Sequence, residues 1–200
     1  MNLIDSAFNA VRREDFVLPQ DRMHANDDVP LPIGYGQTIS QPSTVRRMLE
    51  WLDPQPGEKI LDVGSGSGWT TALLSHIVGP TGRIYAVEII PALSRTGKRN
   101  CQKIGVTNAE FFIAGAKTGL PKYGPYDRIL VSAAAEEMQD DLRSQLKIGG
   151  KLVIPIRYTI HEMTKMVDGW GDIPHPGFVF VPLVVQYKMT KKERRYYNRL

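Results

Sequence analysis

Short apolar segments alternate with amphipathic segments along the middle of the chain. The apolar segments are rich in Ile, Val and Leu and predict strands at 59–63, 83–87, 109–113, 128–131 and 151–154. Apolar residues recur at helical spacing between them, over 43–52, 69–78, 90–104 and 139–146. This alternation predicts an α/β fold with a doubly wound, mostly parallel sheet, which binds ligands at the carboxyl ends of its strands.

The length and composition fit one globular domain. A chain of 200 residues can bury its own core, and fractions of 42% hydrophobic and 23% charged residues exclude a disordered or fibrous protein. We therefore expect a single domain over 1–187. Near its end, Trp170 and the Pro174-His-Pro-Gly177 stretch predict a late loop, to which we assign no place in the site.

Cysteine and histidine usage gives no sign of a disulfide or a metal. Cys101 is the only cysteine, which suits a reducing compartment, and the four histidines lack the spacing of metal ligands. The first residues do not form a signal peptide, and no apolar run reaches membrane-spanning length. We expect a monomeric cytoplasmic protein with no metal and no membrane partner.

The net charge of +4 is concentrated at the carboxyl end. Residues 188–200 carry a net charge of +5, so the rest of the chain is nearly neutral. Such a basic end is most often a solvated tail. We expect no nucleic-acid partner, although the tail leaves a site for nucleic acid or an acidic protein open.

A glycine-rich loop follows the strand predicted at 59–63. The sequence Asp62-Val-Gly-Ser-Gly-Ser-Gly68 leads directly into a helix that begins at Trp69. Glycines let the backbone approach a ligand closely, and the start of a helix offers free N–H groups. The alternative is a plain tight turn, but a place between strand and helix is the context in which such loops bind nucleotide-type ligands.

Two details of this loop favour S-adenosylmethionine over a dinucleotide or ATP. The spacing is G-x-G-x-G rather than G-x-G-x-x-G, and no Gly-Lys-Ser/Thr is present to hold a triphosphate. An acidic residue at the strand end would repel a pyrophosphate but attract an ammonium group. The cofactor-binding residues predicted here are Asp62, Gly64, Ser65, Gly66 and Gly68.

A second carboxylate follows the strand predicted at 83–87. Glu88 lies about 20 residues beyond the glycine loop, which is the spacing of a residue that accepts hydrogen bonds from ribose hydroxyls. We predict that Glu88 and the adjoining Ile89 complete the cofactor site. The alternative is a solvated charge ahead of a helix, since Pro91 favours a helix start.

The segment 28–42 predicts an ordered loop, because it is too rich in Gly and Pro for a helix or a central strand. It offers Gln37, Thr38 and Ser40 as uncharged hydrogen-bonding groups, with glycines for close approach of a ligand. The alternative is a segment that only caps the helix expected from Ser43.

Several of these segments resemble the protein-L-isoaspartate O-methyltransferases, which repair isomerised aspartyl residues. The resemblance covers roughly residues 8–185 and is carried by 11–16, 30–42, 60–68, 126–129, 145–150 and 180–183. The glycine loop occurs in many methyltransferases. The sequence Leu-Pro-Ile-Gly-Tyr-Gly-Gln-Thr-Ile-Ser-Gln-Pro, at 31–42, is characteristic of this family.

The resemblance implies a Rossmann-like class I methyltransferase fold with an N-terminal extension of helix and loop. It implies a substrate-side segment at 1–53, a cofactor-binding core at 54–156, and strands and a loop at 157–187. The cofactor would be S-adenosylmethionine and the substrates isoaspartyl proteins or peptides. Ser40 and Thr38 would be catalytic, and Gln37 and Ile39 would bind the substrate.

The chain departs from the family's pattern at two places. The family's Gly-Asp-Gly after the third strand aligns with Ala114-Gly115-Ala116, so the aspartate that helps to hold adenosine is missing, and Glu136 stands in place of a proline. Loss of a charge-assisted acceptor is worth ~1.5–3 kcal/mol, which predicts weaker cofactor binding at Gly115 and Ala116. Two alternatives stay open: a peptide-binding module with weakened or no turnover, and a methyltransferase for another substrate.

Overall fold

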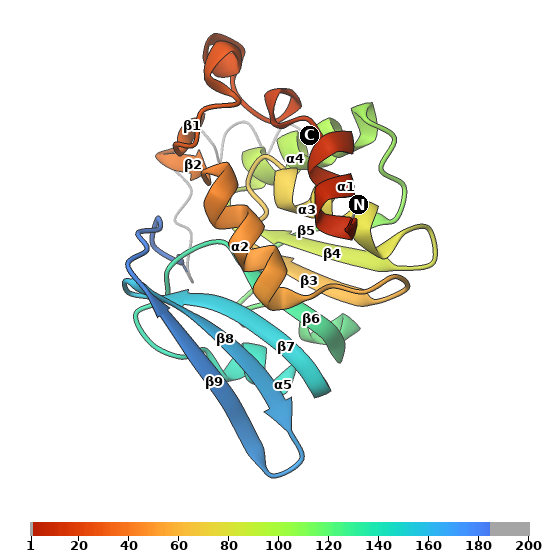
Figure 1. Cartoon of the computed structure of the whole chain (residues 1–200), viewed down its shortest axis with the longest axis vertical. Coiled ribbons are helices and arrows are strands. Elements are labelled where there is room, and N and C mark those ends of the chain that lie inside the picture. Colours follow the sequence, from red (N-terminus) through yellow and green to blue (C-terminus); the bar gives the residue numbers. More distant parts are fainter. Residues whose placement is uncertain (1, 185–200) are drawn as a thin grey trace.

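A seven-stranded sheet forms the centre of the computed structural model, which describes residues 2–184 (Figure 1). The strands are β3 (Lys59–Val63), β4 (Arg83–Glu88), β5 (Ala109–Ile113), β6 (Tyr126–Val131), β7 (Leu146–Ile156), β8 (Thr159–Met166) and β9 (Gly169–Pro176). Their order in the sheet is β5-β4-β3-β6-β7-β8-β9. The first five strands are parallel and β8 pairs antiparallel with both its neighbours, so the predicted mostly parallel sheet is confirmed.

Helices cover both faces of this sheet. They are α1 (Leu3–Ala10), α2 (Pro42–Leu52), α3 (Trp69–Val78), α4 (Pro91–Lys103) and α5 (Asp140–Ser144), with short 3-10 helices η1 (Arg13–Asp15), η2 (Pro19–His24) and η3 (Pro121–Tyr123). The neighbours Ile60 and Leu61 on β3 are both fully buried, and they belong to two different hydrophobic clusters. The cluster of Ile60 includes residues of α1 to α4, whereas that of Leu61 includes Leu142 of α5.

The segment 28–42 is not a loop throughout. Leu31–Gly34 (β1) and Gln37–Ile39 (β2) form a two-stranded antiparallel sheet, in which Leu31 pairs with Ile39. The two turn residues, Tyr35 and Gly36, have positive φ angles of 56° and 71°, as a type I′ hairpin turn requires. The loop prediction was wrong here because both strands of a ribbon are edge strands, where Pro32 is tolerated.

The late loop predicted around Trp170 was also wrong. These residues form β9, which pairs along its whole length with β8. Pro174 and Pro176 lack an N–H group, but β9 is the edge strand of the sheet and outward-facing positions there need no donor. The helix predicted at 139–146 is shorter, since the chain enters β7 at Leu146.

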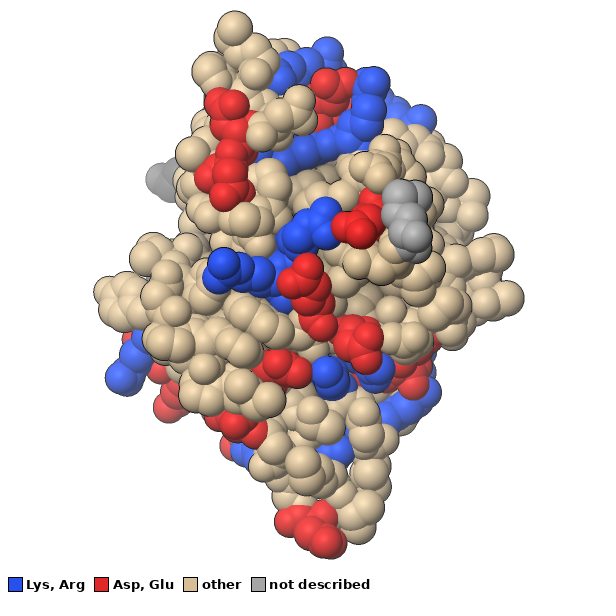
Figure 2. Space-filling view, viewed as in Figure 1, with Lys and Arg blue, Asp and Glu red and all other residues tan. Residues whose placement is uncertain are grey.

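Charges of both signs are mixed on the face shown in Figure 2. Ion pairs such as Arg46–Asp5 and Arg128–Glu58 join some of the charged residues. Within residues 2–184, no helix is both long enough and apolar enough to cross a membrane. The basic tail predicted at 188–200 lies outside the described residues.

Candidate functional site

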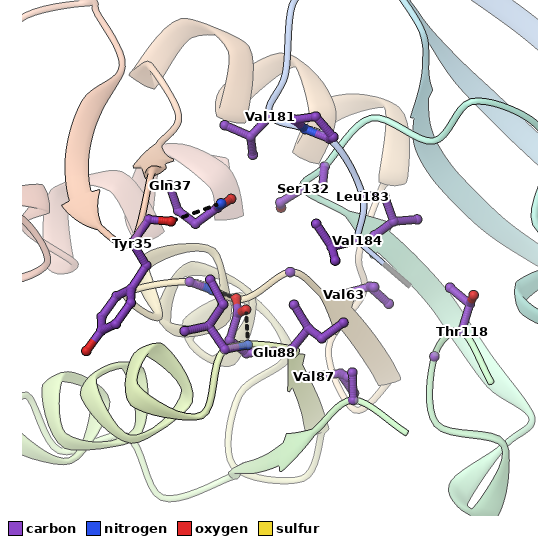
Figure 3. A pocket seen from close by; sticks show the side chains of 18 of the residues that line it. Tyr35, Gln37, Val63, Val87, Glu88, Thr118, Ser132, Val181, Leu183 and Val184 are labelled. Atoms are coloured by element: carbon purple, nitrogen blue, oxygen red, sulfur yellow. Dashed lines mark hydrogen bonds between the residues drawn. The ribbon is translucent and has the colours of Figure 1, made fainter. Parts of the chain in front are cut away.

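A cavity near the predicted motifs lies where β3, β4, β5 and β6 end (Figure 3). Its walls come from the β1–β2 hairpin, the glycine loop, the residues after β4 and β5, and residues 181–184. Its cavity volume is about 150 Å³, and its mouth is open to solvent. We call it the main cavity.

The glycine loop adopts a conformation that only glycine tolerates easily. Gly66 has a φ of +52° and lines the main cavity, and a Cβ there would lie 3.0 Å from Cδ1 of Ile33 in the hairpin. Gly68 has a φ of +92°, and a Cβ there would lie 2.9 Å from the carbonyl oxygen of Gly97 in α4. Gly68 therefore serves close packing of α3 on α4 and does not line the main cavity.

Glu88 fastens the glycine loop and also borders the main cavity. Its Oε2 accepts a hydrogen bond from the N–H of Gly66 and its Oε1 accepts one from the N–H of Ile90, both at 2.9 Å (Figure 3). Burial raises the pKa of Glu88, although these two hydrogen bonds act in the opposite direction. Each oxygen keeps a second lone pair that can accept from a ligand hydroxyl.

Asp62 lies behind the loop and is fully buried. Its Oδ2 accepts hydrogen bonds from the hydroxyls of Thr70, at 2.9 Å, and Thr71, at 2.6 Å, so it fixes the first turn of α3. Burial raises the pKa of Asp62 to about 6. Asp62 is not among the residues that line the main cavity.

Two buried oxygens of this region have no hydrogen-bond partner among residues 2–184: Oδ1 of Asp62 and Oγ of Ser65. An unpaired buried polar atom destabilises a protein by ~1–3 kcal/mol, so a ligand that carries donors is favoured here. Ser65 lines a smaller cavity between the loop and β2. The unpaired hydroxyl of Ser65, with the negative charge of Asp62 behind it, suits the ammonium end of an amino-acid cofactor, so these residues fit S-adenosylmethionine.

The substrate-side residues lie opposite the loop. Thr38 lines the main cavity and two neighbouring cavities, whereas Ser40 lines only the neighbouring two. Gln37 lines the main cavity, and its Nε2 donates to the carbonyl oxygen of Tyr35 at 3.4 Å (Figure 3). Ile39 borders one smaller cavity and is otherwise buried in the core.

The residues predicted at the adenosine end are only partly brought together. Ile89 and Gly115 line the main cavity and Ala116 does not. A Cβ at Gly115 would meet no atom within 4 Å, so the position is open. Lys117 and Thr118 line the cavity nearby, and the sequence motifs did not indicate either residue.

Ser132 is the main residue of the site that the sequence motifs missed. It lines the main cavity and both neighbouring cavities, and its N–H donates to the carbonyl oxygen of Val63 at 2.9 Å. A signal was available, because Ser132 directly follows the strand β6 at the edge where ligands bind. Residues 181–184, which form one wall of the main cavity, do not follow a predicted strand. Their place at the site depends on pairing of Ala134 with Pro182.

The match to known proteins covers nearly the whole chain. The sequence profile of the family described as Protein-L-isoaspartate(D-aspartate) O-methyltransferase matches residues 2–186. The chain belongs to this family. A protein-L-isoaspartate O-methyltransferase of Aeropyrum pernix is 45% identical over 200 residues, which cover 96% of this chain and 76% of that protein. One of Pyrococcus horikoshii is 41% identical, covering 92% of this chain and 86% of that protein.

Two solved structures share the fold of this chain. A protein-L-isoaspartate O-methyltransferase superposes with a TM-score of 0.82 at 26% identity, covering 92% of this chain and 62% of that one. A putative one from Plasmodium falciparum, in complex with S-adenosyl-L-homocysteine, shares the fold with a TM-score of 0.80 at 23% identity, covering 93% and 92%. The resemblance and the Rossmann-like fold predicted from the sequence are confirmed.

The pKa of Asp62 predicts an unusual dependence of stability on pH. Folded Asp62 holds its proton up to about pH 6, whereas the unfolded chain releases it near pH 3.8. The contribution of the protonated carboxyl to the unfolding free energy is fully present below pH 3.8 and is lost as the pH rises to about 6. The side chain introduced by Asp62→Asn does not titrate. The unfolding free energy of this variant minus that of the parent should therefore increase by about 2–3 kcal/mol between pH 4 and pH 7.

Urea unfolding of the cofactor-free protein at both pH values measures this difference. Asp127→Asn is the control of opposite sign. Burial alone raises the pKa of Asp127, but hydrogen bonds from Lys147 and Lys59 bring it below its usual value. Asp127→Asn should therefore have a lower unfolding free energy than the parent mainly above pH 4. A difference in unfolding free energy between Asp62→Asn and the parent that is the same at pH 4 and pH 7 would contradict the prediction.

Proposed function

We propose that the chain transfers the methyl group of S-adenosylmethionine to the α-carboxylate of L-isoaspartyl residues in damaged proteins and peptides. The observation that carries the proposal is the placement of Thr38 beside Gly64 and Gly66 in one cavity, with Ser40 in the cavities adjoining it. This arrangement brings the segment characteristic of the family against the loop that suits the cofactor. The names of the relatives agree with this activity.

The chemistry explains why the site needs neither a metal nor a histidine. In an isoaspartyl linkage the main chain runs through the side-chain carboxyl, so the α-carboxylate is free. With a pKa near ~4 it is ionised at neutral pH and needs no general base. Bound S-adenosylmethionine supplies an activated methyl group to a carboxylate oxygen. The transfer leaves S-adenosylhomocysteine. The amide nitrogen of the following residue then attacks the ester carbonyl, expels methanol and closes a succinimide, whose hydrolysis returns some normal aspartate.

The residues of the chain contribute orientation and exclusion of water. We assign to the hydroxyls of Ser40 and Thr38 the role of holding the carboxylate in line with the methyl group, which can contribute several kcal/mol. Glu88 and the glycine loop hold the cofactor. Apolar residues such as Val181 and Leu183 line the main cavity and limit solvation of the carboxylate.

A methyl-transfer assay tests this function with an isoaspartyl peptide and its normal aspartyl twin. We expect labelling of the isoaspartyl peptide alone. Equal labelling of both peptides would indicate another substrate, and labelling of neither would favour the peptide-binding module. Calorimetry with S-adenosylmethionine tests cofactor binding independently of the peptide. A chain that binds no cofactor at millimolar concentration is not a methyltransferase of this type.

Gly115→Asp should strengthen cofactor binding. The position lines the main cavity and is sterically open, so a new carboxylate can accept a hydrogen bond from the adenosine end. A charge-assisted hydrogen bond of ~1.5–3 kcal/mol corresponds to a decrease in Kd of at least tenfold. Calorimetry measures the Kd, with Gly115→Asn as the uncharged control. An unchanged Kd in Gly115→Asp would show that an aspartate at this position does not determine cofactor affinity.

The predictions of a monomer, of a cytoplasmic location and of the division into 1–53, 54–156 and 157–187 stay predictions. Sedimentation velocity of the full chain tests the first of them.

A further inference from the structure

Arg13 is a buried residue outside the cavities, and its side chain holds the backbone on the substrate side of the site. The residue is only 5% exposed. Its two terminal nitrogens donate to five carbonyl oxygens: those of Ala25 (3.0 Å), Asp27 (3.3 Å), Val29 (2.8 Å), Ile39 (3.4 Å) and Ser40 (3.1 Å). One guanidinium thus joins the segment before the hairpin to the end of the hairpin.

Arginine is well suited to this role, because its planar group presents donors in a fixed fork and stays charged. Burial lowers the pKa of Arg13, while the charges of Asp28 and Asp27 raise it. Asp28 is itself fixed, since its Oδ1 accepts a hydrogen bond from the N–H of Ser43 at 2.8 Å. The start of α2, the hairpin and Arg13 therefore form one connected unit.

The same guanidinium also lies against the cofactor side. Its Cζ is 5.5 Å from the centre of the Trp69 ring, within the distance of a cation–π interaction. Trp69 is the first residue of α3, directly after Gly68. Its Nε1 donates to the carbonyl oxygen of Val11 at 3.5 Å. The segment 11–13 thus contacts both the end of the glycine loop and the backbone of Ser40.

We propose that Arg13 is a positioning residue, which holds Ser40 at a fixed distance from the glycine loop and so aligns the substrate carboxylate with the methyl group. This inference rests on the role proposed above for Ser40. A displacement of about 1 Å between reacting groups can lower a rate by ~10²-fold, so the fork has a large effect on turnover without touching the substrate. Lysine retains the charge but cannot donate in the same fork.

Arg13→Lys tests this proposal in two backgrounds. In the parent chain it should lower kcat for the isoaspartyl peptide by ~10–100-fold and change the Kd for S-adenosylmethionine by less than about threefold. In Ser40→Ala, the same substitution should lower kcat by less than about threefold, because residues that act through one another are not additive. An equal factor in both backgrounds would overturn the proposal.

Phe16→Leu is the control for a purely structural effect. Phe16 is buried beside η1, and its side chain is not part of the fork or of the cavities. It should lower the melting temperature and leave kcat at 25 °C within about twofold of the parent. Equal losses of kcat in Phe16→Leu and Arg13→Lys at matched stability would also overturn the proposal.

Trp69→Phe provides a test if Arg13→Lys does not fold. It keeps an aromatic face under Arg13, removes the hydrogen bond to Val11 and shortens the buried side chain, so kcat should fall by about threefold or more. An unchanged kcat would contradict the positioning role. Absence of isoaspartyl methylation by the parent chain would instead refute the proposed function.

Discussion

Ser40→Ala should lower kcat for an isoaspartyl peptide by ~10–100-fold, while the Kd for S-adenosylmethionine changes by less than about threefold. Attack of a carboxylate on a sulfonium cancels two charges, so a hydroxyl that donates to the carboxylate does not become more effective in the transition state. Its contribution is orientation of the attacking oxygen. The loss should therefore appear in kcat under saturating peptide and cofactor.

Single-turnover kinetics measures this effect without interference from product release. Ser43→Ala is the matched control, because Ser43 lies three residues away and lines neither the main cavity nor its two neighbours. Alanine also keeps the backbone N–H that donates to Asp28. It should retain the parent kcat within about twofold. A normal kcat in Ser40→Ala would remove Ser40 from the catalytic residues and leave the hydroxyls of Thr38 and Ser132 as the remaining donors.

Glu88→Ala should give the opposite pattern, with an increase of about 10²-fold in the Kd for S-adenosylmethionine. The carboxylate accepts from Gly66 and Ile90, so its loss frees the loop and also removes the expected acceptor for the ribose hydroxyls. At saturating cofactor, kcat should stay within about tenfold of the parent, since the groups that orient the peptide are unchanged.

Calorimetry with S-adenosylmethionine and with its demethylated product measures the Kd. Glu88→Gln should be intermediate, because the amide keeps one accepting oxygen but loses the charge. Glu110→Ala is the control on the neighbouring strand, as its carboxylate is exposed and does not line the main cavity. Equal Kd values for Glu88→Ala and the parent would show that Glu88 serves the fold and does not bind the cofactor.

The candidate site was predictable where its residues follow strands. Gly64, Gly66 and Glu88 lie at strand ends, and the carboxyl ends of parallel strands meet at one edge whatever the details of packing. Asp62 follows the same rule in sequence, yet the structure places it behind the loop. The orientation of its side chain depends on the hydroxyls of Thr70 and Thr71, which both donate hydrogen bonds to it from the first turn of α3.

The sequence by itself determined the strands and helices of 43–131, the glycine loop and the family, because hydrophobic periodicity and turn chemistry act over short distances along the chain. Tertiary structure alone decided the β1–β2 hairpin, the edge strand β9, the wall at 181–184 and the fork of Arg13. Each of these depends on partners distant in sequence, or on whether a strand lies at an edge. Residues between 13 and 40 thus meet on one guanidinium, a contact that no local pattern encodes.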